Sequence, residues 1–70
     1  MQLYEFTSQD QKEYIFLIAN DNEQAIKEAN NIAAQNGSNY IFGASDAIII
    51  EDVYLSKKTQ IGVVEYLNFR

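Results

Sequence analysis

Residues 20–37 read NDNEQAIKEANNIAAQNG and carry the clearest helix signal in the chain. Apolar side chains recur there at three- and four-residue spacing, which places them within an arc of about 120° on a helix, the width of a core-facing stripe. The stripe consists of Ala25, Ile26, Ala29, Ile32 and Ala33. Asn20 or Asp21 can cap the start, and Gly37 can end the helix by turning left-handed. The stretch therefore predicts one helix with one buried face.

The stripe of this helix is mostly alanine, so it buries little apolar area. At about 25 cal/mol per Å² of buried apolar surface, it cannot stabilise a domain by itself. Large side chains must come from the rest of the chain, which has the alternating and β-branched pattern of strands. We expect these strands at residues 2–7, 13–19, 47–55 and 60–69.

The four expected strands differ in their patterns. Residues 13–19 (EYIFLIA) are apolar on both faces, which is typical of a central strand. In the last strand, alternation would place Val63 and Leu67 on one face and Val64 and Tyr66 on the other.

The segments between the strands predict the connections. Residues 8–12 (SQDQK) and 56–59 (SKKT) are polar and suit the loops of two hairpins. Residues 38–46 fit either a short strand or a connection pinned by its aromatic side chains. The predicted fold is α+β, with the order β-β-α-β-β, a mainly antiparallel four-stranded sheet and one helix packed on one face.

Composition narrows the class of protein. The chain has 70 residues, enough for one small domain spanning residues 1–70. Its formal net charge of −5 disfavours nucleic acid and anionic membranes as direct partners, but permits a protein partner with a basic surface. The chain begins without a signal-peptide pattern and has no apolar run of membrane-spanning length, so we expect a cytoplasmic location.

Catalytic chemistry has few candidate groups here. The chain contains no cysteine and no histidine, which leaves its serines without the usual activating base and its carboxylates as the main potential metal ligands. A metal site at Asp46, Glu51 or Asp52 matches no known spacing, and a paired-carboxylate cleft needs more depth than so short a chain supplies. We expect a non-enzymatic protein without metal or cofactor.

Apolar and aromatic side chains exceed what one helix can cover. Because the strands carry large groups on both faces, the sheet face away from the helix should combine apolar, tyrosine and carboxylate side chains. The candidate partner-binding residues are Glu5, Glu51, Asp52, Tyr54, Glu65 and Tyr66. The alternative is that the carboxylates only protect an edge strand and the tyrosines only seal the rim of the core.

The helix NDNEQAIKEANNIAAQNG lies between the strand pairs YEF/EYIFLIA and AIIIEDVYL/IGVVEYLNF. In this plan the whole chain resembles small phage-encoded anti-CRISPR and other anti-defence proteins. The resemblance implies a stoichiometric inhibitor in the host cytoplasm, which binds a basic surface of a nucleic-acid-handling effector. It also implies that acidic strand residues imitate phosphate charge. It assigns a role to no individual residue.

Two other functions remain open from the sequence. The free sheet face could be the subunit interface of a structural homo-oligomer, such as a homodimer. A small-ligand sponge, with a pocket between subunits, is the third hypothesis, although the acidic charge disfavours an anionic ligand.

Overall fold

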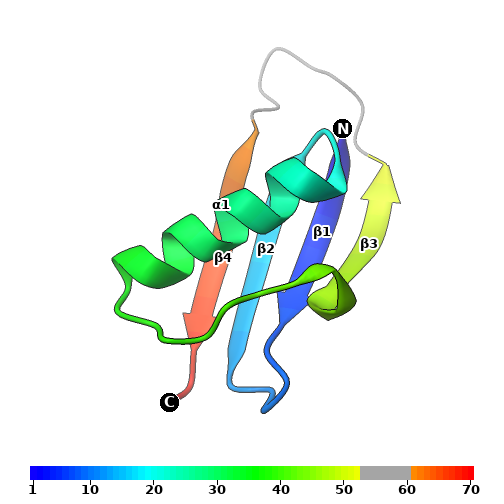
Figure 1. Cartoon of the computed structure of the whole chain (residues 1–70). Coiled ribbons are helices and arrows are strands. Elements are labelled where there is room, and N and C mark those ends of the chain that lie inside the picture. Colours follow the sequence, from blue (N-terminus) through cyan, green and yellow to red (C-terminus); the bar gives the residue numbers. More distant parts are fainter. Residues whose placement is uncertain (53–60) are drawn as a thin grey trace.

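The computed structural model describes residues 1–52 and 61–70, with the backbone alone at residues 51 and 52 (Figure 1). One helix and a short 3₁₀ turn accompany four strands, in the predicted order β-β-α-β-β. The elements are β1 (Gln2–Thr7), β2 (Glu13–Ala19), α1 (Asn22–Gln35), η1 (Ala44–Asp46), β3 (Ala47–Asp52) and β4 (Gly62–Asn68). The predicted α+β class is confirmed, as are both strands of the first hairpin.

The strands form one sheet in the order β3-β1-β2-β4, with every neighbouring pair antiparallel. The central position predicted for β2 is confirmed, since it pairs with β1 and β4. The prediction of a second hairpin between β3 and β4 is wrong. The hairpin of β1 and β2 has two free edges: β3 pairs with β1 at one edge, and β4 pairs with β2 at the other. The predicted loop at residues 56–59 lies outside the described residues.

Helix α1 runs obliquely across one face of the sheet (Figure 1). Its N-cap is Asp21, whose Oδ1 accepts a 2.8 Å hydrogen bond from the backbone N–H of Gln24. The side chain of Gln24 reaches back and accepts from the N–H of Asn20 at 2.8 Å. Asp21 is therefore the cap, and the Gln24 side chain adds a bond to the backbone of Asn20, the residue before the cap.

The helix ends at a glycine. Gly37 has φ of 78°, and its N–H donates to the carbonyl of Ala34, while the N–H of Ser38 donates to that of Ala33. These two bonds make a Schellman motif and satisfy carbonyls that the helix end would leave free. The predicted role of Gly37 is confirmed.

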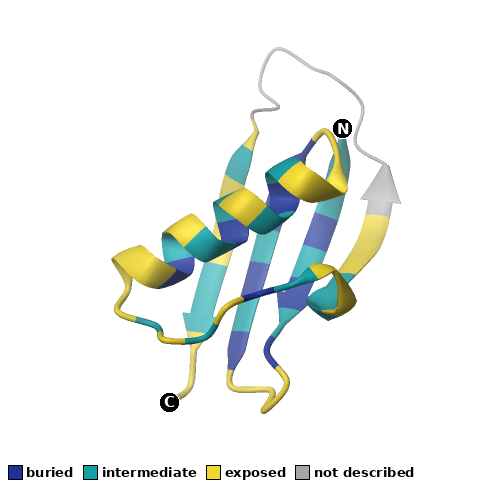
Figure 2. Cartoon of the chain, in the orientation of Figure 1, coloured by how far each residue is buried: buried dark blue, intermediate teal, exposed yellow. Residues whose placement is uncertain are grey.

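The core lies between α1 and the sheet (Figure 2). Its buried side chains come from β1, β2, α1 and the segment after the helix. They are Tyr4, Phe6, Ile15, Leu17, Ala19, Ala25, Ala29, Ala33 and Phe42. The alanines let the helix backbone approach the sheet closely, so the large side chains come from the strands. Ile26 and Ile32 pack at the border of this core.

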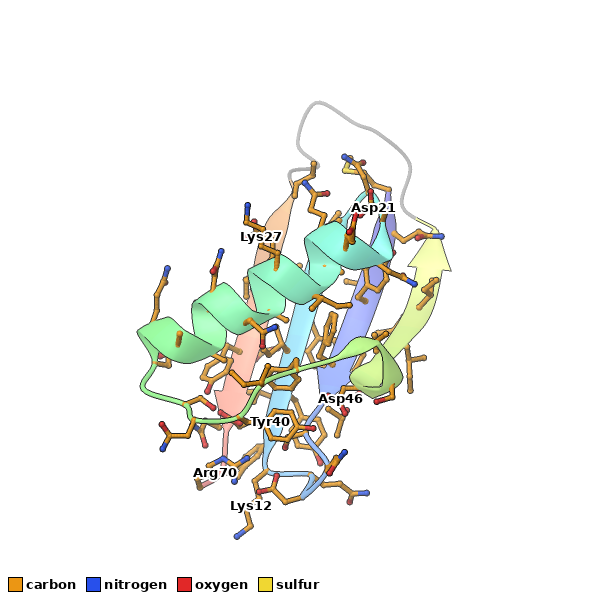
Figure 3. All side chains as sticks on the ribbon, viewed as in Figure 1. Lys12, Asp21, Lys27, Tyr40, Asp46 and Arg70 are labelled. Carbon is orange, nitrogen blue, oxygen red and sulfur yellow. The ribbon has the colours of Figure 1, made fainter. Side chains whose placement is uncertain are left out.

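Residues 38–46 form a connection pinned by its aromatics, the second of the two predicted alternatives. The side-chain amide of Asn30 bonds both backbone groups of Phe42: Nδ2 donates to the carbonyl at 3.1 Å, and Oδ1 accepts from the N–H at 2.8 Å. The ring of Phe42 packs edge-on against Phe6, with centroids 5.9 Å apart. Tyr40 donates from its hydroxyl to the carboxylate of Asp46 at 3.0 Å (Figure 3). This segment therefore covers the part of the sheet that α1 leaves uncovered.

Both edge strands contain a β-bulge. In β4, Val63 pairs with Leu17 and Glu65 with Phe16, so Val64 is the extra residue. The prediction that Val63 and Leu67 share a face is wrong, because a bulge reverses the alternation beyond it. In β3 the extra residue is Ile50.

Candidate protein-binding face

The sheet face opposite α1 is the candidate site, and we call it the open face. Along β1 and β2, buried residues that face the helix alternate with half-buried residues on the other side. Directly paired residues of neighbouring strands share a face, so the register extends this assignment to β3 and β4. The open-face residues are Leu3, Glu5, Thr7, Tyr14, Phe16, Ile18, Ile48, Glu65 and Leu67.

A row of paired residues crosses the middle of the open face. Glu5 pairs with Phe16, and Phe16 pairs with Glu65, so one carboxylate lies on each side of the aromatic ring. Directly paired side chains have Cβ atoms about 5 Å apart. Ile48 continues the row on β3, next to Glu5. The row thus alternates apolar and acidic side chains across all four strands.

An apolar ridge runs perpendicular to this row along β2. Tyr14, Phe16 and Ile18 follow one another on the open face at about 6.8 Å, two residues of an extended strand. The ring of Tyr14 packs edge-on against Phe69, with centroids 5.9 Å apart. Phe69 is 64% exposed, although its N–H is anchored to the carbonyl of Lys12 at 2.7 Å. The ridge ends in an aromatic pair of which Phe69 is the exposed member.

The charge of the open face is entirely negative over the residues that the structure describes there. Glu5 and Glu65 provide its carboxylates, and no lysine or arginine occupies any of the assigned positions. The formal charge of the whole chain, −5, has the same sign as the charge of this face.

The structure brings together some of the predicted site residues. Glu5 and Glu65 lie on the open face, and the backbone register places Glu51 opposite Leu3, at an open-face position. Asp52 pairs with Gln2, at a position on the helix side of the sheet. Tyr54 lies outside the described residues.

Tyr66 occupies the helix side of the sheet. It pairs with Ile15 and packs against the core, and its hydroxyl donates to Oε1 of Glu13 at 2.7 Å. Its exposed neighbour Glu65 points to the opposite side, as successive residues of a strand do. Of the predicted binding residues Glu65 and Tyr66, only Glu65 therefore lies on the open face.

Glu13 is a buried carboxylate to which the sequence pattern assigned no role. Its side chain has no exposed surface and accepts hydrogen bonds from Tyr66 and from Nη2 of Arg70, the latter at 3.1 Å. Burial alone would raise the pKa of Glu13, but hydrogen bonds from Ser38, Tyr66 and Arg70 outweigh it, so this pKa lies below its ordinary value. The sequence signal for its burial is the alternation along β2, because residues 15, 17 and 19, which share a face with Glu13, are all apolar.

Arg70 also pairs with Asp10 in the loop between β1 and β2. Hydrogen bonds from Ser8 and Arg70 lower the pKa of Asp10 to about 2. The guanidinium of Arg70 and the two carboxylates of this cluster satisfy one another. The cluster therefore ties the chain end to the first hairpin, and we assign it a structural role.

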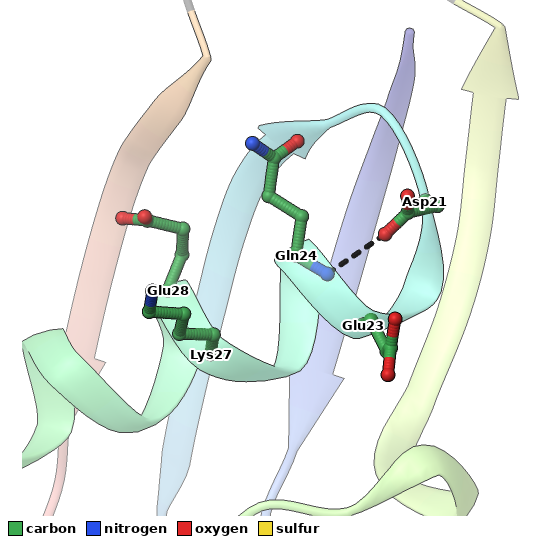
Figure 4. A pocket seen from close by; sticks show the side chains of 5 residues that line it. All are labelled: Asp21, Glu23, Gln24, Lys27 and Glu28. Carbon is green, nitrogen blue, oxygen red and sulfur yellow. Dashed lines mark hydrogen bonds between the residues drawn. The ribbon is translucent and has the colours of Figure 1, made fainter.

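A shallow depression lies over the first turns of α1 (Figure 4). Five side chains line it: Asp21, Glu23, Gln24, Lys27 and Glu28. It is acidic and polar, contains a lysine and has no aromatic side chain, so it contrasts with the open face. Over the described parts of the chain, no group of three or more acidic side chains is close enough to hold a metal ion.

Comparison with family models, curated proteins and solved structures gives no match to this chain. Among the described residues, no helix has the length and apolar character needed to cross a membrane.

Proposed function

We propose that this chain is a non-enzymatic protein-binding module that docks its open face onto a basic surface of a partner protein. The observation that carries the proposal is the row in which Glu5 and Glu65 flank Phe16. Antiparallel sheets commonly leave one face to solvent, but that face is then mainly polar, whereas exposed apolar surface bordered by polar groups commonly marks an interface. Fixed negative charge on that surface selects a positively charged partner.

The resemblance in plan to anti-defence proteins supports a more specific role. Proteins that handle DNA or RNA carry basic surfaces, because they must neutralise phosphates. A rigid acidic face that docks on such a surface would exclude the nucleic acid and inhibit the partner. Glu51, which the register places at the open face beside Leu3, would add negative charge at the β3 edge in the neighbouring row.

The open face is poorly suited to pairing with itself. In a face-to-face dimer the carboxylates of one copy would approach those of the other, with no lysine or arginine on the assigned positions to separate them. Desolvating like charges costs free energy that the apolar ridge must offset. A basic partner removes that cost, which is why we favour a foreign protein.

The test compares capture by three immobilised forms of the chain. These are the wild type, the double variant Glu5→Lys/Glu65→Lys, and the control Glu23→Lys/Glu28→Lys, which makes the same charge change on α1. We expect the proteins captured from host lysate to include one that the open-face variant loses by about tenfold or more and the control retains. Its binding should weaken steeply between low and high salt.

Two results would contradict the proposal. One is a captured set that both double variants change equally, because net charge alone would then explain it. The other is capture that neither charge reversal nor salt affects.

The β3 edge favours a second candidate function, self-association. Ile48, Ile49 and Ile50 are 59%, 49% and 45% exposed, and β3 is an outer strand of the described sheet. Its carboxylates lie at one end, so two copies paired antiparallel about Ile49 would keep the Glu51 positions about 14 Å apart, beyond a Debye length at physiological salt. By contrast, Glu65 is central in β4, where self-pairing would oppose like charges.

This edge contact is small, and the bulge at Ile50 shortens its regular part. Stable interfaces bury roughly 1,200 Å² or more, so only a weak dimer is expected. Sedimentation of the wild type and of Ile49→Lys decides the point. A monomer for both forms at about 100 μM would remove this candidate, and a dimer lost in the variant would favour it over the foreign partner.

A further inference from the structure

We infer that the open face recognises a single arginine of its partner, held on the ring of Phe16 between Glu5 and Glu65. The inference rests on the proposed function, since it names the chemical group that docks at the middle of the face. Its basis is the position of these three side chains in one row of the sheet.

The row provides two different attractions at one point. A cation above an aromatic ring is drawn to the negative face of the ring, and carboxylates on both sides add charge-assisted hydrogen bonds. Paired residues are about 5 Å apart at Cβ, so both glutamates can reach a group that covers the ring between them. Phe16 is half-buried, which fixes the ring by its neighbours and leaves part of it accessible.

The arrangement favours a guanidinium over an ammonium. A guanidinium is flat, stacks on an aromatic face, and carries N–H donors on opposite edges that can address two carboxylates at once. An ammonium is compact and strongly hydrated, and it loses more water when it leaves solvent for the ring. Arginine should therefore bind here more tightly than lysine.

The other side chains of the ridge would form the surroundings of the bound arginine. Tyr14 and Ile18 lie on either side of Phe16 along β2, at about 6.8 Å. Residues four apart on a helix are separated by about 6 Å, so a partner helix lying along β2 would place apolar side chains one turn before and one turn after the arginine. The part of the partner's basic surface that docks here would thus carry an arginine flanked by apolar side chains.

The test uses the full-length chain, labelled with ¹⁵N and ¹³C, and three small probes. N-acetyl-arginine amide, N-acetyl-lysine amide and N-acetyl-citrulline amide are titrated while the ring signals of Phe16 and the carboxyl signals of Glu5 and Glu65 are recorded. We expect the arginine probe to shift all three side chains along one curve, with a dissociation constant of about 1–10 mM. The lysine probe should bind at least about threefold more weakly, and the uncharged citrulline probe should leave the signals unchanged.

The chain supplies its own control in the acidic depression over α1, where Asp21, Glu23 and Glu28 lie without an aromatic ring (Figure 4). Signals of this depression should move little with arginine and equally with lysine. The variant Phe16→Leu should reduce arginine binding to the level of lysine, and Phe16→Tyr, which keeps a ring, should retain the preference. Dispersed amide spectra establish that both variants fold.

Several outcomes overturn the inference. They are equal binding of arginine and lysine, equal shifts at the depression over α1, or an unmoved Phe16 ring. If one of these occurs while Glu5→Lys/Glu65→Lys still abolishes partner capture, the open face remains the binding face and the arginine anchor is wrong. If Glu5→Lys/Glu65→Lys also leaves partner capture unchanged, the proposed function is wrong as well.

Discussion

The hydroxyl of Tyr66 donates a 2.7 Å hydrogen bond to Oε1 of Glu13, a carboxylate with no exposed surface at the start of β2. The two residues are 53 positions apart in the chain, and their contact joins the second edge strand to the first hairpin. A buried carboxylate needs partners of this kind, because an unsatisfied charged group costs far more than a neutral one.

Removing this hydroxyl should destabilise the fold without altering the open face. Tyr66→Phe keeps the ring on the core but takes a donor from Glu13, which we expect to cost about 1–3 kcal/mol. Urea denaturation monitored by circular dichroism measures the change. Tyr14→Phe, on the open face, serves as the control and should stay within about 0.5 kcal/mol of the wild type. Equal effects of the two variants would contradict the role of the pair.

Stability should fall in acid because two carboxylates of this cluster have lowered pKa values. The pKa of Asp10 drops from 3.8 to about 2, and that of Glu13 lies below 4.5. A carboxylate whose pKa is lower in the folded state stabilises the fold above its unfolded pKa, and this contribution disappears as the pH falls through the folded pKa. The urea midpoint should therefore be steady above about pH 5 and decline from about pH 4.5 to pH 2.

The variant Asp10→Asn tests the source of this decline. It removes one of the two titrating groups, so its stability should start lower at neutral pH and change less between pH 4.5 and pH 2. Asp21→Asn provides a comparison away from the cluster and retains an N-cap side chain. A decline in Asp10→Asn as steep as that of the wild type would exclude Asp10 as a cause.

The amide of Asn30 should hold residues 38–46 onto the sheet. Asn30→Ala removes both bonds to the backbone of Phe42, and we expect a loss of about 2 kcal/mol because two backbone groups lose their partners together. The neighbouring exposed Asn31 is the matched control, and Asn31→Ala should be close to neutral. Limited proteolysis should also cut Asn30→Ala faster between residues 38 and 46. Equal protease resistance of the two variants would contradict the proposed clamp.

The small size of Ala29 sets the distance between helix and sheet. Ala29→Leu forces extra volume into a fully buried position, which should destabilise the fold by about 1–3 kcal/mol or more. Ala34→Leu makes the same substitution on the exposed side of α1 and should have little effect. Thermal unfolding of both variants measures the difference, and a similar melting temperature for the two would show that the alanine stripe does not limit the packing.

The elements of this fold follow from local patterns. The alanine and isoleucine stripe, the acidic start and Gly37 determine α1, since capping and periodicity depend on residues a few positions apart. The same holds for β1 and β2, whose bounds match the predicted strands. The surplus of apolar side chains also predicts that one sheet face lacks a covering helix.

The candidate site was predictable only in part. Glu5 and Glu65 stand out in the sequence as charges within strands, but nothing local places Phe16 between them. That arrangement requires β1 and β4 to lie on opposite sides of β2, which depends on which edge each strand joins. Tyr66 illustrates the same limit, because a bulge at Val64 and a buried glutamate far along the chain determine its surroundings.

The helix, the strands, the net negative charge and the absence of cysteine and histidine chemistry can all be read from the amino-acid sequence. The strand order, the two bulges, the pairing of Glu13 with Tyr66 and Arg70, and the alignment of Glu5, Phe16 and Glu65 in one row emerge only in the folded chain. The two sets differ in the range of the interactions behind them. Capping and periodicity act between near neighbours in the chain, whereas strand register and buried charge pairing depend on residues that meet only when the core has formed.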